Sequence, residues 1–284
     1  MAMLLSVLVV IAKTIRWKYL LRMQEIQYGM KRALIAYFSS IFLASVTPGR
    51  IGDLTKMLYL TWDNKANYGK SLSSIIVDKI FDLFFLVLFV LGGTLFFTIP
   101  TRLKIAVILF GLSLLSVSTL IMKKNFISNQ ILHFVRMISP KYEKKLRTAS
   151  DDFYGGIDSL NSLHLLLPAL LSFIAYFLFF FQCYFISLAL ELSIPFFYLA
   201  FSISIANLIA LIPISVSGIG TRDAALILLF SFMGLTKEVS VSFSFLFLFS
   251  SLFLKDLIGG ILWFKEPVEI KGMWKKATHY SMVE

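Results

Sequence analysis

Pro48-Gly49-Arg50-Ile51-Gly52-Asp53 interrupts a hydrophobic run of membrane quality, and a second interruption follows in the other half of the chain. The second reads Pro213-Ile214-Ser215-Val216-Ser217-Gly218-Ile219-Gly220-Thr221-Arg222-Asp223. Backbone that leaves the helix at membrane depth is tolerated only where it is buried in protein or lines a cavity. A charged side chain at that depth marks a candidate functional site. The two breaks therefore predict a transport-type site between two repeats.

The composition is that of a polytopic membrane protein. The 284 residues are 58% hydrophobic and 15% charged, whereas about 25% of the residues in a soluble domain are charged. Several segments approach the roughly 20 apolar residues that a helix needs to cross a bilayer. Cytoplasmic loops rich in Lys and Arg explain the net charge of +11, because such loops face anionic lipid. We expect no nucleic-acid partner, since no basic face is interleaved with stacking aromatics.

The residues that hold metals or form disulfides are sparse. The single Cys183 lies in an apolar run, and His133, His164 and His279 lie far apart without the spacing of metal ligands. The sequence also contains no set of nucleophile, base and orienting residue, and no nucleotide-binding loop. We therefore expect no metal, no cofactor and no catalytic residue.

The hydrophobic pattern predicts an all-α fold with long helices and two interrupted hairpins. The expected helices cover 2–21, 74–99, 104–122, 165–190 and 240–264, and the hairpins cover 33–62 and 196–234. Each hairpin contains one break, and its arms are too short to span the bilayer comfortably. The hairpins are therefore interpreted as re-entrant segments or as pairs of half-length helices. The first helix is short at its N-terminal side, which leaves open a further segment upstream.

A basic segment fixes the orientation. Residues 123–150 contain seven Lys or Arg against one acidic residue, Glu143. The spacing of Lys141, Lys144, Lys145 and Arg147 suits an interfacial amphipathic helix, and a solvated basic loop explains it equally well. In either case we expect 123–164 to face the cytoplasm.

Counting outward from that segment predicts an inverted repeat. Hairpin 33–62 starts and ends inside, hairpin 196–234 starts and ends outside, and the tail 265–284 is cytoplasmic. The order helix, hairpin, helix thus occurs twice with opposite orientation, in 1–122 and in 165–264. We expect a multi-pass protein of the cell membrane.

The first break carries the chemistry of an anion site. Arg50 and Asp53 are three residues apart, within reach of each other if the chain turns helical after Pro48. A half-helix that starts near Ile51 would direct free backbone amides at an anion. Arg50 adds a planar fork of donors that suits phosphate, and Gly52 lets the backbone approach a ligand closely.

The second break supplies a matching set at the start of another half-helix. We therefore expect a lipid head group to be bound by residues of both breaks, namely Arg50, Gly52, Asp53, Gly218, Gly220, Arg222 and Asp223. The alternative is that each Arg–Asp set is a structural ion pair that locks the tip of its hairpin. The two interpretations are compatible.

Further charges lie within expected helices. Asp78 and Asp82 flank Lys79 and share a helix face. They form either an interfacial cluster or partners of Arg50 across a hydrophilic cavity, where one carboxylate could carry a proton.

Two more pairs of charges need an explanation. Lys255 and Asp256 lie about midway along the last helix, so an interior partner is expected. Lys13 and Arg16 are interpreted as interface anchors. The Ser-rich stretch 240–251 either lines a polar path or holds helices together.

These motifs together resemble the lysylphosphatidylglycerol synthase transmembrane-region family, which includes the flippase domain of bacterial multiple peptide resistance proteins and stand-alone flippase-like membrane proteins. The resemblance runs in order along nearly the whole chain. It is carried by Arg16-Trp17, the first break, Asp78-Lys79 with Asp82, and Gly218-Ile219-Gly220 with Arg222-Asp223. The family usually has Arg where Lys79 stands, Glu where Asp223 stands, and an extra helix first.

The resemblance implies a protein that moves an anionic or aminoacylated phospholipid, or a lipid-linked precursor, between leaflets. One alternative is a membrane-embedded head-group transferase of the phosphatidylglycerol lysyltransferase kind. It is the less favoured one, because only about twenty residues follow the last expected helix, and in full-length synthases a separate soluble domain performs the transfer. Another is a non-transporting partner that recruits a cytoplasmic or membrane-associated transferase, such as a cell-envelope glycosyltransferase, through 123–164.

Overall fold

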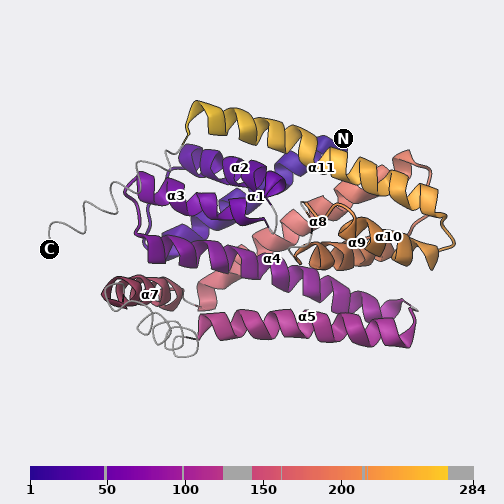
Figure 1. Cartoon of the computed structure of the whole chain (residues 1–284), viewed down its shortest axis with the longest axis horizontal. Coiled ribbons are helices and arrows are strands. Elements are labelled where there is room, and N and C mark those ends of the chain that lie inside the picture. The colour runs from indigo at the N-terminus through magenta and orange to yellow at the C-terminus, as the bar shows by residue number, and fades with distance from the viewer. Residues whose placement is uncertain are drawn as a thin grey trace.

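A computed structural model describes residues 1–47, 50–97, 99–123, 143–160, 162–212, 215 and 217–267. All regular structure in these residues is helical, as the sequence predicts. The helices are α1 (Ala2–Met23), α2 (Met30–Val46), η1 (Ile51–Leu54), α3 (Thr55–Trp62), α4 (Tyr68–Phe96), α5 (Thr101–Met122), α7 (Glu143–Asp158), η3 (Ser162–Leu165), α8 (Leu166–Ala189), α9 (Phe196–Ala210), α10 (Thr221–Ser231) and α11 (Lys237–Lys265) (Figure 1).

The helix boundaries follow the hydrophobic pattern closely, with one extension. Three described helices are long and apolar enough to cross a membrane by length and composition, namely α5, α8 and α11. Helix α4 begins at Tyr68, before the expected residue 74, because the side chain of Asn67 caps it by accepting a hydrogen bond from the backbone amide of Lys70 at 3.1 Å. The polar first turns of α4 therefore extend beyond the apolar run.

The first break joins α2 to α3 through the short 3₁₀ helix η1. Pro48 and Gly49 lie outside the described residues. Arg50 adopts a left-handed backbone conformation (φ 56°) and directly precedes η1. A Cβ at Gly52 would lie 2.1 Å from the carbonyl carbon of Leu43, so η1 packs directly on the backbone of α2. The close approach expected at Gly52 is therefore made to a helix of the protein itself.

The second break joins α9 to α10. Pro213, Ile214 and Val216 lie outside the described residues. Gly218 and Gly220 have positive φ angles of 74° and 83°, a region that glycine adopts without strain. Gly220 is the N-cap of α10, and its amide donates to the carboxylate of Asp223 at 2.9 Å. Both breaks are thus short polar connections between two half-length helices.

Helices from the two halves of the chain pack against each other. Helix α1 lies against α8, α2 lies against α11, and α4 lies against α9. Figure 1 shows α11 along one side of the bundle and α4 through its middle. The largest buried cluster joins α4, α8, α9, α10 and α11 around Phe180, Phe201 and Phe230. The largest hydrophobic core therefore lies where α4 of the first half packs against helices of the second half.

Helices α5 and α7 lie at the outside of the bundle, next to α4 (Figure 1). The apolar face of α7 packs on the protein, because Tyr154 and Ile157 cluster with Leu20 and Val77. For residues 143–150, the helical part of that basic segment, the solvated-loop interpretation is therefore wrong. The apolar face of α7 around Tyr154 and Ile157 is covered by protein and not left free for lipid. The remainder of the basic segment from 124 to 142, and the tail from 268, lie outside the described residues.

Candidate functional site

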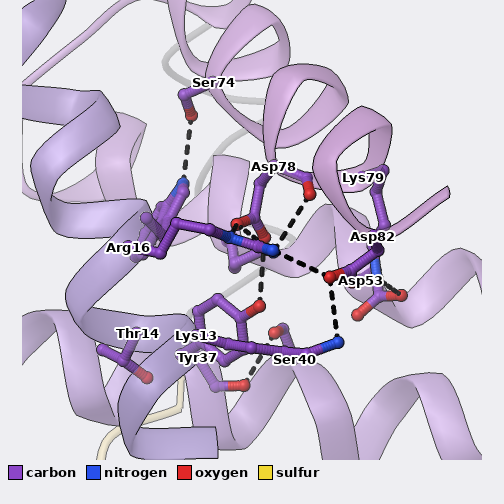
Figure 2. A network of polar contacts seen from close by, with 12 residues as sticks. Lys13, Thr14, Arg16, Tyr37, Ser40, Asp53, Ser74, Asp78, Lys79 and Asp82 are labelled. Carbon is purple, nitrogen blue, oxygen red and sulfur yellow. Dashed lines mark hydrogen bonds and ion pairs between the residues drawn. The ribbon is translucent and has the colours of Figure 1, made fainter. Parts of the chain in front are cut away.

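A buried ion network joins α1 to α4, α3 and α8. Arg16 and Asp78 are both fully buried. The Nε and Nη2 atoms of Arg16 donate to Oδ1 of Asp78 at 2.9 and 2.7 Å (Figure 2). Its Nη1 donates to Oγ of Ser172 at 2.9 Å. The other oxygen of Asp78 accepts from Lys56 at 2.9 Å and from the hydroxyl of Tyr37 at 3.0 Å. Asp78 is thus a buried carboxylate that forms ion pairs with two buried cations, Arg16 and Lys56.

Asp82 extends this network by one helical turn. Its Oδ1 lies 2.9 Å from Nη1 of Arg16 and 2.9 Å from Nζ of Lys13. The interpretation of Lys13 and Arg16 as interface anchors is therefore wrong. Arg16 is 0% exposed, and each of the two basic side chains has a carboxylate partner inside the bundle. Asp78 and Asp82 make their direct ion pairs with Arg16, Lys56 and Lys13 and not with Arg50. Asp82 and Arg50 nevertheless line the same cavity, whereas Asp78 does not.

At the first break, Asp53 accepts from two cations through the same oxygen. Oδ2 of Asp53 lies 2.6 Å from Nζ of Lys79 and 3.4 Å from Nε of Arg50. The pairing of Arg50 with Asp53 is thus confirmed, and Lys79 adds a partner from α4. Asp53 is 6% exposed, but the side chain of Arg50 is 47% exposed. Arg50 is therefore anchored at one atom, and much of the side chain remains accessible.

At the second break, Arg222 is buried with few partners. Its Nη1 lies 3.5 Å from the backbone oxygen of Ser217, and its Nη2 lies 3.6 Å from Oδ1 of Asp223. The guanidinium stacks over Phe247, with its central carbon 4.7 Å from the ring centroid. Asp223 is committed elsewhere, because it accepts from the amide of Gly220 and from the hydroxyl of Ser244. The local Arg–Asp separation is thus similar at the two breaks, 3.4 and 3.6 Å, but only Asp53 has a second cation, Lys79, within 4 Å among the described residues.

Lys255 and Asp256 lie inside the bundle, as the sequence predicts. Their side chains are 16% and 14% exposed, and Nζ and Oδ1 are 3.9 Å apart. One turn and three turns before Lys255, the serine stretch of α11 contacts other helices: Gln182 donates to Ser251 at 2.9 Å, and Ser244 donates to Asp223. The serines thus hold helices together, and Ser251 also lines the cavity described next.

One cavity of about 630 Å³ reaches both breaks. Its charged lining residues are Lys13, Arg50, Asp53, Lys79, Asp82, Arg222 and Lys255. Direct contact also joins the second break to the last turn of α2, because the hydroxyl of Ser217 donates to the backbone oxygen of Ser45 at 2.6 Å. Two segments far apart in the sequence therefore present cations to a single space.

The expected site residues divide into two groups by position. Arg50, Asp53, Gly218 and Arg222 line the cavity, and so do Lys79, Asp82 and Lys255 from the helices. The remaining ones do not line it: Gly52 packs on α2, Gly220 and Asp223 cap α10, Asp78 is enclosed by its cations, and Asp256 lies beside Lys255.

The part of the chain that forms the cavity and both breaks matches a known protein family. A family model described as the lysylphosphatidylglycerol synthase transmembrane region matches residues 1–259. The chain belongs to this family. The match takes in every helix that lines the cavity and both breaks, so the recognition made from the motifs is confirmed.

The chain is also similar to one curated membrane protein along most of its length. A UPF0104 membrane protein of Pyrococcus horikoshii is 25% identical over 287 aligned positions, which cover 93% of this chain and 86% of that protein. No solved structure matches the chain. Family membership and the apolar helices together indicate a membrane location.

Sequence reasoning missed three residues of the network, namely Tyr37, Lys56 and Ser172. Lys56 follows the first break by three residues, within an apolar stretch of eight residues that forms α3. A lysine in so short an apolar helix is a signal of a buried partner. Tyr37 and Ser172 carry no such signal, because tyrosine and serine are ordinary in membrane helices. Among the described residues, no group of three or more His, Cys, Asp or Glu is placed to hold a metal ion.

Proposed function

We propose that this protein moves an anionic or aminoacylated phospholipid, or a lipid-linked precursor, between the two leaflets of the cell membrane. The observation that carries the proposal is the single cavity lined by both Arg50 and Arg222. Guanidinium groups bind phosphate through paired hydrogen bonds. A head group held between the two breaks would be shielded from the hydrocarbon while it crosses.

The shape and lining of the cavity suit a lipid. Its volume lies within the range of about 300–1,000 Å³ that is usual for binding pockets. Ile51, Leu54 and Leu211 line it and are 63%, 40% and 43% exposed, so apolar side chains of both breaks stand where it reaches the surface. Acyl chains could remain in the bilayer there while the head group occupies the polar interior.

The helix contacts support the inverted repeat on which such transport would depend. If α1, α2, α3 and α4 correspond to α8, α9, α10 and α11, the contact of α2 with α11 corresponds to that of α9 with α4. The contacts of α3 with α4 and of α10 with α11 correspond in the same way, and α1 meets its counterpart α8 directly. Each break then occupies the same place in its repeat. Alternating access can follow from rocking one repeat against the other around a fixed site.

In this proposal the hairpins enter from opposite faces and 123–164 faces the cytoplasm. The proposed repeats are 1–122 and 165–264, joined by the basic segment. In this orientation α7 would be a cytoplasmic helix that packs against the first turns of α4.

The test is lipid translocation in proteoliposomes that contain fluorescently labelled phosphatidylglycerol. A membrane-impermeant quencher added outside reports how much labelled lipid has left the inner leaflet. Wild-type protein should accelerate translocation relative to protein-free liposomes. Arg50→Ala and Arg222→Ala should each lower the rate about tenfold or more, as expected for a lost charge-assisted phosphate contact of 1.5–3 kcal/mol. Arg102→Ala, in which an exposed arginine at the start of α5 is removed, is the matched control.

Normal translocation by folded Arg50→Ala and Arg222→Ala proteins would exclude the site. A head-group transferase remains the alternative activity, and product formation by the purified protein from aminoacyl donor and lipid would establish it. Deletion of 143–158 tests the recruiting role, because loss of a transferase in a pulldown with intact translocation would favour a partner-binding function for that segment.

A further inference from the structure

The charges around the cavity do not cancel. Its cations are Lys13, Arg50, Lys79, Arg222 and Lys255, against the two carboxylates Asp53 and Asp82. The charged residues immediately behind these add two cations, Arg16 and Lys56, and three carboxylates, Asp78, Asp223 and Asp256. An excess of positive charge therefore remains in a mostly apolar surrounding, where charge interactions are screened less than in water.

The carboxylates of the lining already have cationic partners. Asp53 lies beside Lys79 and Arg50, and Asp82 lies beside Lys13 and Arg16. An incoming ammonium group would have to displace one of these cations or share its carboxylate. Like charges brought together without a partner are destabilising, so the cavity discriminates against cationic head groups.

Arg222, in contrast, has donors to offer. It is 6% exposed and lines the cavity, and its Nε and Nη2 have no hydrogen-bond partner within the described part of the chain. The carboxylate of Asp223 is 3.6 Å from Nη2, which is an ion pair beyond hydrogen-bond distance. Leaving buried donors unsatisfied costs about 1–3 kcal/mol, and more for charged groups. Stacking on Phe247 compensates the charge only in part. A phosphate that accepts from these two atoms would satisfy them with a paired, charge-assisted geometry.

Lys255 continues the positive surface along α11. Phe247, Ser251 and Lys255 are spaced by one helical turn and all line the cavity, so Lys255 lies about 12 Å along the axis from the ring that supports Arg222. The nearest carboxylate, Asp256, is 3.9 Å away. The second half of the chain thus contributes two weakly paired cations on adjoining helices.

We infer that the cavity accepts a lipid whose head group is a phosphate monoester or diester with net negative charge, bound at Arg222 while Lys255 adds positive charge farther along the same cavity, and rejects cationic aminoacylated lipids. This inference rests on the proposed translocation and narrows its substrate class. The apolar lining, including Leu83, Leu86, Leu114 and Ile121, favours a lipid phosphate over a free one, because burial of acyl chains adds hydrophobic energy that a free anion lacks.

Binding is measured first, without transport, on the full chain in neutral detergent by native mass spectrometry. The probes are phosphatidylglycerol, lysylphosphatidylglycerol and phosphatidylcholine. We expect phosphatidylglycerol to bind at least about tenfold more tightly than lysylphosphatidylglycerol, because the two head groups differ in the sign of their net charge. Equal or tighter binding of lysylphosphatidylglycerol would overturn the inference. Inorganic phosphate and glycerol phosphate serve as competitors, and full displacement of the lipid by either at equal concentration would overturn the assignment to a lipid.

Substitutions of Arg222 and Lys255 test whether these residues cause the preference for phosphatidylglycerol over lysylphosphatidylglycerol. Arg222→Gln should reduce the preference for phosphatidylglycerol several-fold, and Lys255→Glu should reduce it further or reverse it, since it replaces a cation by an anion. Arg102→Gln should bind as the wild type does. If Arg222→Gln does not fold, Lys255→Gln takes its place with the same expected direction. Unchanged selectivity in folded variants would exclude this pair as the phosphate site.

The two proposals fail in different ways. Translocation of both lipids with no preference would leave lipid transport standing and refute the charge selectivity. Selective binding of phosphatidylglycerol without translocation of any lipid would refute transport and leave the selectivity standing.

Discussion

Arg16 shows how a single buried charge can organise several helices. It lies on α1 and bonds to the side chain and the backbone oxygen of Asp78 on α4, and to Ser172 on α8. Burying an ion pair is costly unless its remaining donors and acceptors are satisfied. Here Asp78 also accepts from Lys56 and Tyr37. The network therefore specifies how five helices, α1, α2, α3, α4 and α8, fit together.

Removing Asp78 should destabilise the fold strongly. In Asp78→Ala the cations of Arg16 and Lys56, both 0% exposed, lose the carboxylate between them. Breaking a buried pair from one side typically costs about 3–5 kcal/mol. We expect a markedly lower melting temperature and poor recovery of monodisperse protein in detergent, with Asp158→Ala as the control because that carboxylate is exposed on α7. Wild-type melting of Asp78→Ala would show that the network does not stabilise the fold.

At the scale of elements, the two breaks share a plan but differ in charge pairing. Each joins two short helices and contains an arginine, Arg50 directly before η1 and Arg222 in the first turn of α10. At the first break Asp53 is held by Lys79 and Arg50. At the second, no lysine of the described residues takes the place of Lys79 against Asp223, which accepts from Gly220 and Ser244. The first break is thus fixed by ion pairs, and the second leaves its arginine available.

Close packing at the first break predicts a sharp difference between two glycines. Gly52→Ala places a methyl group within 2.1 Å of the backbone of Leu43, whereas a Cβ at Gly92 in α4 meets nothing within 4 Å. Overpacking costs about 1–3 kcal/mol, and Gly→Ala within a helix gains up to about 1 kcal/mol. Gly52→Ala should therefore lower the melting temperature and Gly92→Ala should maintain or raise it. The same response of both variants would contradict the packing of η1 on α2.

At the scale of the whole molecule, the cavity exists because helices of the two halves alternate in space. Helix α11 packs on α2 and α9 packs on α4, so each break is enclosed partly by the other half. The contact of Ser217 with Ser45 closes this arrangement at 2.6 Å. If the halves rock against each other during translocation, this contact is one that must change.

Fixing that contact should stop transport. In a Cys183→Ala background, a protein with Ser45→Cys and Ser217→Cys is treated with a short thiol cross-linker, and linkage is read by mass spectrometry of the joined peptides. We expect the linked protein to lose nearly all lipid translocation and the reduced or unlinked protein to retain it. Each single-cysteine variant, treated in the same way, is the control. Full translocation by the linked protein would rule out relative motion at this contact.

The sequence by itself determined the membrane character, the helices and the two breaks, because each follows from local hydrophobicity and from where proline, glycine and charge interrupt it. It also identified Arg50, Asp53 and Arg222 as unusual, since charge at membrane depth requires a partner or a function. The pairing of Arg50 with Asp53 is local, three residues apart, and could be predicted for that reason.

Only the tertiary structure decided which charges neutralise each other. The sequence suggested interface anchors for Lys13 and Arg16 because aromatic and basic residues follow them in the second half of α1. Their carboxylates lie some sixty residues away on α4: Asp78 is separated from Arg16 by 62 positions. Asp78, once paired there, is enclosed and does not line the cavity, whereas Arg222 is left with open donors. Hydrophobicity is a property of a segment, but the electrostatic balance of a site depends on how the segments are packed.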